Sequence, residues 1–438
     1  KENTGINISV KSFITAIVVI FALMVLTYGL TFVIPGGGIP FWKWILSPVL
    51  VLGAEGNVSL IAVIVFLLVI GGIFNCLDKC GLMQYMLDTI TDKYGKDRYK
   101  LLALVTLFFM AMGSMIGSFE EAVPMVPIVV ALAVRLGWNP LVGLGMSILA
   151  IGCGFSAGVC NPFTVGVAQE LAGLPMFSGV WFRIIGFVLV YLLLLGFLYS
   201  YAKKIEKPIN TEEFKHNFVY DAKMTKGLKL FAGIMCGGIL LVLSSVVLTF
   251  LQDITMIIVA VTFLVAGIVG VAVTGRGGNI PKTFFNGVSS VFAAVFMILM
   301  ANSIKYTMVE GNILDPILQG MVSTASTLPG WSVILFIYLI VLVLNFFIAS
   351  GSAKAFLLMP LIIPIAETFG ISSQLCIVAF AFGDGFSNVL YPTNPVLLIS
   401  LGLADVDYGK WFRWSWKFQL LNLIMTSALL LFGLMIGY

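Results

Sequence analysis

Four ionisable side chains interrupt long apolar stretches of the sequence: Glu120, Glu121, Lys354 and Asp384. A charged side chain at the centre of a bilayer is unfavourable by roughly 2.5–3.5 kcal/mol on insertion scales, and it usually marks a transport pathway or a proton relay. Carboxylates can bind a cationic group, a coupling cation or a proton, and an ammonium can face an anion. These residues are therefore candidates for binding a small charged metabolite. The alternative is a structural pair that holds neighbouring segments together.

Short polar side chains accompany these four residues in segments rich in glycine and proline. They are Ser118, Asn161 and Thr164 in the first half, and Ser350, Ser352, Asn388, Thr393 and Asn394 in the second. Glycine and proline end helices, so 156–164 and 383–395 predict interruptions of two apolar helices. An interrupted helix has free N–H groups that suit a carboxylate and free carbonyls that suit Na⁺. Asn161 and Asn394 precede prolines, and are equally suited to capping a half-helix.

The elements that carry these residues must lie in lipid. The chain of 438 residues is 60% hydrophobic and 10% charged, with a mean hydropathy of +1.09, whereas a soluble domain is about 25% charged. The apolar runs are about 18–24 residues long, the length of a helix that crosses a bilayer core. The first run, 12–34, is too long for a signal peptide and is predicted to span the membrane. Period-two alternation is absent, which predicts an all-α membrane protein.

The basic residues predict the topology. If 100–137 and 330–369 are re-entrant helical hairpins and the N-terminus is inside, most lysines and arginines fall on the inner side, as expected for a bacterial inner membrane. This count gives about nine transmembrane helices and two hairpins, the first opening inward and the second outward. Re-entrant backbone is tolerated only where protein or a water-filled cavity satisfies it. The hairpin tips therefore indicate a site.

The two halves of the sequence are similar to one another. GSFEEAVPMVPIVVALAVRLG (117–137) is similar to SGSAKAFLLMPLIIPIAETFG (350–370), and GCGFS, NP and VWFR at 152, 161 and 180 match GDGFS, NP and KWFR at 383, 394 and 410. The offset stays near 231, which predicts a duplication whose copies are inverted in the membrane, as in many secondary transporters. Glu121 and Lys354 occupy equivalent positions with opposite charge, and we hypothesise that they neutralise one another.

These patterns predict three parts of the chain. The first repeat is 1–202, with the inward-opening hairpin 100–137 and a broken helix 139–172. A cytoplasmic linker follows at 203–226. The second repeat is 227–438, with the outward-opening hairpin 330–369 and a broken helix 371–400.

Other polar and aromatic residues receive structural predictions. Lys305, Glu310 and Asp315 are expected to be solvated in an outer segment, and Arg183 is expected to anchor a span at the interface. An aromatic belt is predicted from Trp42, Trp44, Trp181, Trp331, Trp411, Trp414 and Trp416.

Enzyme and nucleic-acid signatures are missing from the sequence. GxxxxGK[ST] and HExxH do not occur, and no basic aromatic-rich surface is predicted. The six cysteines and the single histidine lack metal-ligand spacing, so the metal content stays unknown. We therefore expect no enzyme and no cofactor. Without an ATP-hydrolysing motif, uphill transport would use Na⁺, H⁺ or exchange.

The motifs GSFEEAVPMVPIVVALA, CNPFTVGVAQ, SGSAKAFLLMPL and AFGDGFSNVLYPTNPV resemble those of the YfcC-type carriers. These are grouped with the anaerobic four-carbon-dicarboxylate carriers in the ion transporter superfamily. More distantly, the layout is similar to the p-aminobenzoyl-glutamate transporters and the divalent-anion/sodium symporters. The resemblance implies a homodimer whose hairpins and broken helices move as an elevator against a scaffold of outer spans. In the symporters, Ser-Asn-Thr tips hold carboxylate and Na⁺. Here the first tip reads Ser118-Phe119-Glu120, which leaves dicarboxylate and Na⁺ specificity open.

The acidic pair Glu120 and Glu121 decides which hypothesis about function is preferred. Two carboxylates would repel a dicarboxylate unless protonated or paired with Lys354, so the first hypothesis is exchange or uptake of basic amino acids such as arginine and ornithine. Glu120 and Glu121 would bind the cationic group or carry protons, and N–H groups near Asn161 and Asn394 would hold the α-carboxylate. The second hypothesis is an H⁺- or Na⁺-coupled four-carbon dicarboxylate carrier. The third is a channel or a membrane sensor.

Overall fold

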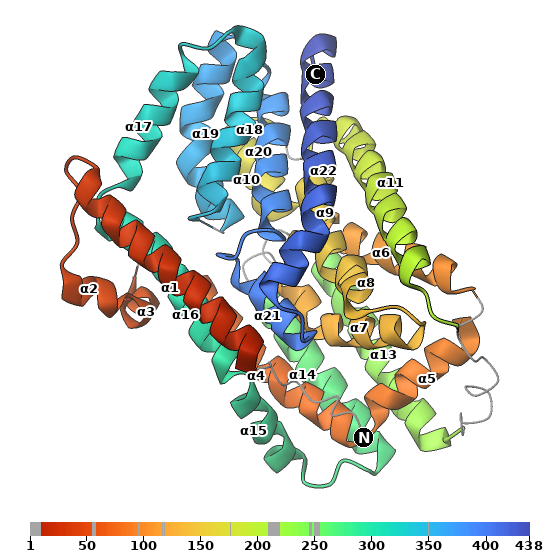
Figure 1. The fold of residues 1–438 in the computed structure, drawn as a ribbon. Coiled ribbons are helices and arrows are strands. Elements are labelled where there is room, and N and C mark those ends of the chain that lie inside the picture. Colours follow the sequence, from red (N-terminus) through yellow and green to blue (C-terminus); the bar gives the residue numbers. More distant parts are fainter. Residues whose placement is uncertain are drawn as a thin grey trace.

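The computed structural model describes residues 10–54, 58–94, 97–115, 117, 119–175, 177–208, 220–244, 248, 255–348 and 350–438. Within them the chain forms helices joined by turns, and no strand occurs in this part of the chain. The prediction of an all-helical fold is confirmed (Figure 1).

The helices of the first half are α1 (Val10–Val33), α2 (Phe41–Ile45), α3 (Ser47–Leu50), η1 (Val51–Gly53), α4 (Val58–Lys79), α5 (Leu82–Tyr94), α6 (Arg98–Met115), η3 (Glu120–Met125), α7 (Val126–Arg135), α8 (Pro140–Leu144), η4 (Gly145–Leu149), α9 (Ala150–Ala157), η5 (Pro162–Gly166), α10 (Val167–Leu171) and α11 (Val180–Ile205). Those of the second half are α13 (Ala222–Ser244), α14 (Thr255–Thr274), α15 (Ile280–Ser290), α16 (Phe292–Glu310), α17 (Leu314–Ala325), α18 (Gly330–Asn345), α19 (Gly351–Thr368), α20 (Ser373–Asn388), α21 (Pro395–Leu403) and α22 (Tyr408–Ile436).

Several helices are long and apolar enough to cross a membrane. By length and composition, four in the described part qualify: α6, the run from α8 to α9, α11 and α22. A fifth span is possible if Leu67–Lys79 and Leu82–Ile90 are one helix with a 74° bend. Large apolar side chains are exposed along α1, α11 and α22, where lipid can cover them. The chain is therefore a multi-pass membrane protein, and nine spans remain a prediction.

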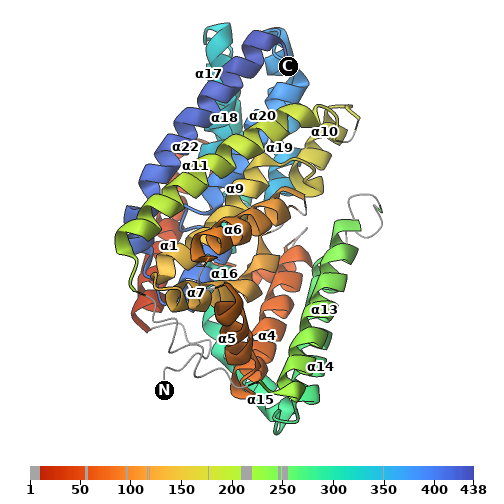
Figure 2. The same cartoon turned by 90° about the vertical axis from the view of Figure 1, so that its right-hand side faces the viewer.

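The helices form two packed groups. Around α9, the helices α6, α11 and α20 pack together, and α20 also contacts α18, α19 and α22. A second group consists of α4 with α13, α14 and α15, and it lies at the lower end of the molecule in Figures 1 and 2. Helices α1 and α16 pack side by side with their C-terminal ends together, since Gly311 after α16 lies against Thr31 near the end of α1. Helix α21 contacts both of these helices as well as α7 and η3. Thus α21 lies where the first group meets α1 and α16.

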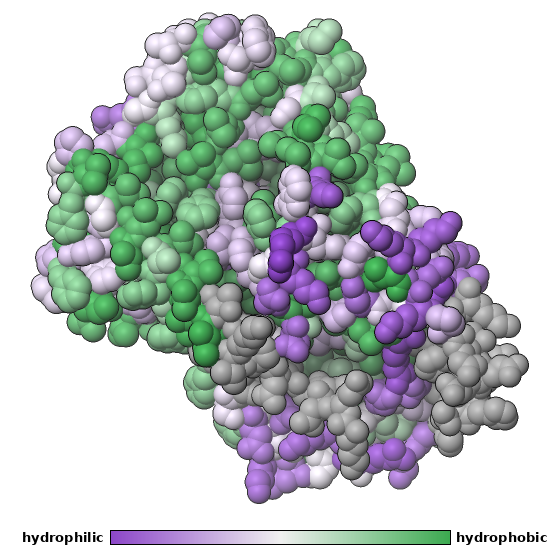
Figure 3. All heavy atoms as spheres, viewed as in Figure 1, coloured by the Kyte–Doolittle hydropathy of each residue, from purple (hydrophilic) through white to green (hydrophobic). Residues whose placement is uncertain are grey.

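Hydrophilic residues are concentrated on one part of the surface. In Figure 3 they gather at the lower right, over the start of α22 and the region of α5 and α7, while hydrophobic residues dominate the upper left. Lys410, Arg413 and Lys417 are exposed at the start of α22. These residues are among those predicted to face the cytoplasm.

Helix contacts in the two halves correspond to one another. Helix α6 packs on α9, and α18 packs on α20. Helix α19 contacts α10 and η5, while η3 and α7 contact α21. In each case the second helical segment of the hairpin in one repeat contacts the part of the broken helix that follows the interruption in the other repeat. This exchange of contacts is what a two-fold relation between the repeats would produce.

The predicted hairpins and broken helices have unequal limbs in the structure. Region 100–137 consists of the 18-residue helix α6, a tip, and the shorter η3 and α7, whereas 330–369 consists of α18 and α19. Helix 139–172 is interrupted between α9 and η5, within the predicted 156–164. Helix 371–400 is interrupted at 389–394, between α20 and α21.

Two local predictions need correction. The outer segment predicted to contain Lys305, Glu310 and Asp315 consists of the end of α16 and the start of α17. Gly383 and Gly385 lie inside α20 and do not end it. A Cβ on Gly385 would lie 2.6 Å from the Ser156 main-chain nitrogen, so this glycine permits close contact between α9 and α20.

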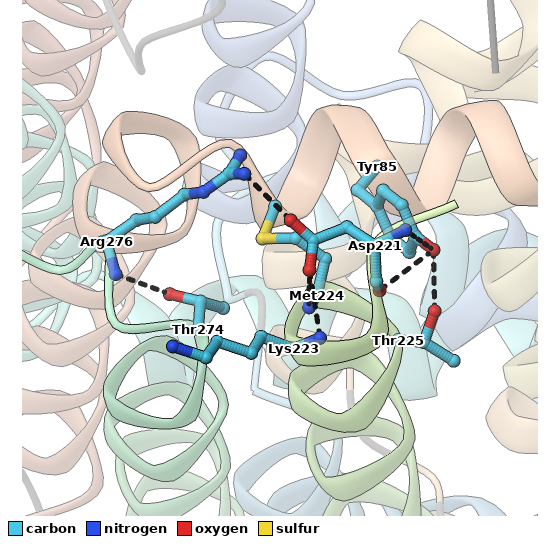
Figure 4. Close-up of polar contacts among 7 residues, drawn as sticks. All are labelled: Tyr85, Asp221, Lys223, Met224, Thr225, Thr274 and Arg276. Carbon is cyan, nitrogen blue, oxygen red and sulfur yellow. Dashed lines mark hydrogen bonds and ion pairs between the residues drawn. The ribbon is translucent and has the colours of Figure 1, made fainter. Parts of the chain in front are cut away.

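A polar cluster anchors the start of α13. Asp221 accepts hydrogen bonds from the main-chain N–H groups of Lys223 and Met224 at 2.9 and 3.1 Å. The same carboxylate forms an ion pair with Arg276, 2.7 Å away in the turn after α14 (Figure 4). The hydroxyl of Tyr85 on α5 lies 2.6 Å from that of Thr225. The cluster therefore joins α5, α13 and α14 next to the predicted cytoplasmic linker, whose residues 209–219 lie outside the described part.

Candidate substrate and coupling site

A buried ion pair connects the second predicted hairpin to the second broken helix. Lys354, in the first turn of α19, contacts the carboxylate of Asp384 in α20. The Lys354 ammonium also donates to the side-chain oxygen of Asn345 at the end of α18. Neither charged side chain is exposed, and Asn345 is 2% exposed. The described partner of Lys354 is therefore Asp384, and the hypothesised pairing with Glu121 involves a side chain that lies outside the described residues.

Asn345 links the ion pair to the end of α20. Its amide nitrogen lies 3.0 Å from the Asp384 carbonyl oxygen, 2.6 Å from the Ser387 hydroxyl and 3.0 Å from the Asn388 side-chain oxygen. That Asn388 oxygen also accepts from the Asn394 amide at 3.1 Å. The network thus runs from α18 and α19, through α20, to the interruption before α21.

The tip of the second hairpin lies directly against the first broken helix. A Cβ on Gly351, the first residue of α19, would lie 2.5 Å from an Asp384 carboxylate oxygen and 2.6 Å from the Thr164 methyl group. Thr164 lies in η5, just after the first interruption. No larger residue fits at position 351 without displacing one of these two side chains.

The tip of the first hairpin also contacts the first interruption. Gly117 has a φ of +76°, a conformation that glycine adopts without strain. A Cβ there would lie 1.8 Å from the Asn161 side-chain oxygen. Nearby, Phe119 and Val389 both lie against Gly152 of α9. The two tips and the two interruptions therefore meet around α9 and α20.

Asn161 and Asn394 cap the half-helices that follow them. The Asn161 side-chain oxygen accepts from the Thr164 N–H at 3.2 Å, and the Asn394 oxygen accepts from the N–H groups of Val396 and Leu397 at 2.9 and 3.3 Å. Helices need such acceptors because their first N–H groups have no partner within the helix. Of the two alternatives for these asparagines, capping is the one that the geometry supports.

At each interruption, a main-chain carbonyl accepts a hydrogen bond from a side chain of the long helix that follows. The Val159 oxygen accepts from Arg183 Nε at 3.3 Å, and the Val389 oxygen accepts from Trp411 Nε1 at 2.8 Å. Arg183 begins α11 and Trp411 begins α22. Each donor thus satisfies a carbonyl that the interruption would leave without a partner.

These contacts correct two sequence predictions. Arg183 is only 1% exposed, and its other nitrogens donate to the carbonyls of Phe177 and Ser178, so it is a buried structural cation and no interface anchor. Trp411 and Trp44 are 0% and 5% exposed and do not belong to an aromatic belt. Lys305 is half-buried in α16, and Glu310 pairs with Lys43.

The sequence analysis did not predict Asn345 and Ser114 as site residues. They lie at the ends of α18 and α6 and form hydrogen bonds with groups at or next to the interruptions. Ser114 accepts from the Val159 N–H through its hydroxyl at 3.0 Å and from the Cys160 N–H through its carbonyl at 3.1 Å. Their separation, 345 − 114 = 231, falls within the offset of the repeat. Two polar residues at equivalent positions near the ends of two apolar helices could have identified this pair from the sequence.

The remaining predicted residues are distributed as follows. Ser118 lies outside the described residues, as do the side chains of Glu120, Glu121 and Ser352, although Glu120 and Glu121 begin η3. Ser350 is exposed and makes no side-chain cap. Thr393 is 5% exposed.

Several buried polar atoms in this region have no hydrogen bond among the described residues. They are both carboxylate oxygens of Asp384 and the hydroxyls of Thr164 and Thr393. Asp384 is nevertheless in ion-pair contact with Lys354, which is an attraction without a well-aligned hydrogen bond. Buried polar atoms of this kind usually bind water, an ion or a ligand. Among the described residues, no group of three or more His, Cys, Asp and Glu side chains could hold a metal.

Comparisons with known proteins agree with the sequence resemblance. The profile of the family described as DcuC, C4-dicarboxylate anaerobic carrier, matches residues 45–435. The "Putative basic amino acid antiporter YfcC" of Escherichia coli (strain K12) is 30% identical over 398 residues, which cover 86% of this chain and 78% of that protein. An "Uncharacterized protein" of Haemophilus influenzae is 26% identical over 404 residues, covering 86% and 75%.

A comparison of folds gives a weaker similarity. The crystal structure of the Alcanivorax borkumensis YdaH transporter aligns with a TM-score of 0.47 and 18% identity, over 97% of this chain and 99% of that one.

Proposed function

Because the chain belongs to the DcuC family of C4-dicarboxylate anaerobic carriers, we propose that it is a secondary carrier which exchanges a small charged metabolite across a bacterial inner membrane. The observation that supports this proposal is the buried network in which two hairpin tips and two helix interruptions meet. Such a network places polar and ionisable groups inside an apolar protein, where they usually mark a transport pathway.

The preferred substrate is a basic amino acid such as arginine or ornithine. Lys354 is paired with Asp384, so its charge is compensated and is not free to attract a dicarboxylate. Glu120 and Glu121 supply two carboxyl groups at the first tip. They would bind the cationic end of the substrate or carry protons. The E. coli relative is named as a basic amino acid antiporter, which is in line with this proposal.

The alternative is an H⁺- or Na⁺-coupled carrier of four-carbon dicarboxylates. The description of the family supports this alternative. The N-terminus of α19 also supports it, because the free N–H groups of a helix N-terminus attract anions. In that case Lys354 would have to leave Asp384 for the substrate. A channel or a sensor is the remaining possibility.

An elevator motion would suit this arrangement of helices. The moving domain would contain the two hairpins and the two broken helices, and α1, α4 and α13–α16 would form the scaffold. Support comes from the contacts of α21 with α1 and α16 and of η3 with α4, which form part of the boundary between the two groups. We further propose inverted repeats, a cytoplasmic N-terminus and a homodimer built on the scaffold.

Substrate-induced thermal stabilisation and counterflow test the proposal. The purified protein in detergent is heated with arginine, ornithine, lysine, alanine, succinate, fumarate or malate, each with and without Na⁺. A ligand that binds the folded state raises the unfolding temperature by mass action. Proteoliposomes loaded with the stabilising ligand then receive the same ligand labelled outside.

The outcomes separate the candidates. Stabilisation and counterflow with arginine or ornithine are expected. Stabilisation by dicarboxylates alone would replace the preferred substrate with the alternative one. Flux without counterflow would indicate a channel, and binding without flux would indicate a sensor.

A further inference from the structure

The Lys354 ammonium is surrounded by oxygen atoms of the kind that bind alkali cations. Its described contacts are the Asp384 carboxylate and the Asn345 side-chain oxygen. Carboxylate and amide oxygens are also the usual ligands of hard cations. All three side chains are buried or nearly so.

A second Asp384 oxygen lies close to this position, because it and the Thr164 methyl group both lie against Gly351. Neither this oxygen nor the Thr164 hydroxyl has a hydrogen bond among the described residues. Thr164 follows the first interruption, Asp384 lies in the second broken helix, and Lys354 belongs to the second hairpin. The cluster therefore joins three segments that an alkali cation could otherwise hold together.

An ionised Asp384 needs a cation at this position. Asp384 is a buried carboxylate, and a buried charge is strongly unfavourable without a partner of opposite sign. The partner in this structure is covalently attached to the chain. It cannot be exchanged with the solution as Na⁺ can.

We infer that the Lys354 ammonium is a tethered substitute for a coupling cation, which occupies a Na⁺-like position between α18, α19 and α20 and makes transport independent of Na⁺. This inference rests on the proposed carrier function and deepens it, since it assigns the coupling at this site. The pair of Lys354 and Asp384 has no net charge, so it contributes no charge movement when the site moves from one face of the membrane to the other.

Removing the lysine side chain tests the inference directly. Lys354→Ala leaves the Asp384 carboxylate and the Asn345 oxygen facing the space that the side chain occupied. Thermal unfolding of this variant and of the parent is measured in NaCl and in choline chloride at equal ionic strength. We expect a saturable rise of about 2 °C or more for Lys354→Ala in NaCl, and no difference for the parent.

Two controls identify the ligand of the added cation. The double variant Lys354→Ala/Asp384→Asn lacks the carboxylate, so its unfolding temperature should not respond to Na⁺. Lys410→Ala removes an exposed lysine from α22, and it should behave as the parent does. A parent that is stabilised by Na⁺, a Lys354→Ala variant that is not, or a response that persists in the double variant would overturn the inference.

A second measurement does not depend on the folding of the variant. Exchange by the parent in proteoliposomes is compared with Na⁺ or choline on both sides, and equal rates are expected. A rate that requires Na⁺ would overturn the inference. Because the thermal experiment contains no transport substrate, its result stands even if the proposed substrates are not transported, and the two proposals fail separately.

Discussion

The carboxylate of Asp384 on α20 is in ion-pair contact with the ammonium of Lys354 on α19, and neither side chain is exposed. Residues 30 positions apart in sequence thus place opposite charges inside the packed helices. The pair connects the second hairpin to the broken helix that follows it, so its removal should affect both stability and transport.

The double substitution in this pair should destabilise the protein by less than the sum of the two single substitutions. Lys354→Met or Asp384→Asn leaves one buried charge without a partner, and each should lower the free energy of unfolding by roughly 3–5 kcal/mol. The double variant should lose clearly less than the sum. Denaturant titration in detergent with choline salts measures the three values, and Lys410→Met is the exposed control. Strict additivity would argue against a coupled pair.

Gly351→Ala should block transport. The added methyl group would lie 2.5 Å from an Asp384 oxygen and 2.6 Å from the Thr164 methyl, and overpacking of this kind costs about 1–3 kcal/mol. Counterflow should fall at least about tenfold, because about 1.4 kcal/mol in a barrier corresponds to a factor of ten. Gly320→Ala is the matched control, since its Cβ would meet nothing within 4 Å in α17. Equal counterflow by both variants would contradict the close contact at the tip.

Trp411→Phe should destabilise the second interruption. The substitution removes the N–H that donates to the Val389 carbonyl at 2.8 Å, and a buried polar group without a partner costs about 1–3 kcal/mol. The thermal midpoint should fall. Trp416→Phe, in the same helix but 42% exposed, should leave it nearly unchanged. Similar midpoints for the two variants would show that the Trp411 hydrogen bond contributes little.

Glu121→Gln should abolish exchange while the protein still folds. The substitution keeps the shape of the side chain and removes the negative charge proposed to bind the cationic group or to carry protons. Counterflow of labelled arginine and gel filtration of the purified variant measure the two properties. Unchanged counterflow would remove Glu121 from the proposed site.

Asp221 should make stability depend on acid pH. The N–H groups of Met224 and Lys223, together with Arg276, hold the pKa of this carboxyl below its ordinary value of 3.8. A carboxyl whose pKa is lower in the folded state stabilises the fold above its unfolded pKa, and this stabilisation is lost as the pH falls through the folded pKa. Asp221→Ala should therefore have a lower thermal midpoint than the parent at neutral pH.

Comparison of the two proteins across pH completes this prediction. The difference between their midpoints should shrink as the pH falls below 3.8. Asp221→Asn keeps an acceptor for the helix N–H groups and should lie between them. A pH-independent difference would show that the charge of Asp221 has no part in the effect.

The sequence alone determined the helical fold, the two interruptions and the composition of both hairpin tips. These features follow from local rules, because apolar runs of sufficient length form helices in lipid, and an asparagine before a proline starts a new helix. The repeat offset even relates Ser114 to Asn345, and the donors Arg183 and Trp411 lie on the equivalent helices α11 and α22. The glycines of GDGFS misled the prediction, since Gly383 and Gly385 permit close helix packing and do not end α20.

The tertiary structure alone decided which charges meet. Sequence equivalence related Lys354 to Glu121, but the packing of α19 beside α20 brings Lys354 to Asp384. It also buried Arg183, which looked like an interface residue, beneath the carbonyls of Phe177, Ser178 and Val159. The partner of a buried polar group is set by the helices that pack around it, because only a group within about 3–4 Å can replace its lost hydration. That distance depends on how the helices cross, which no local pattern in the sequence encodes.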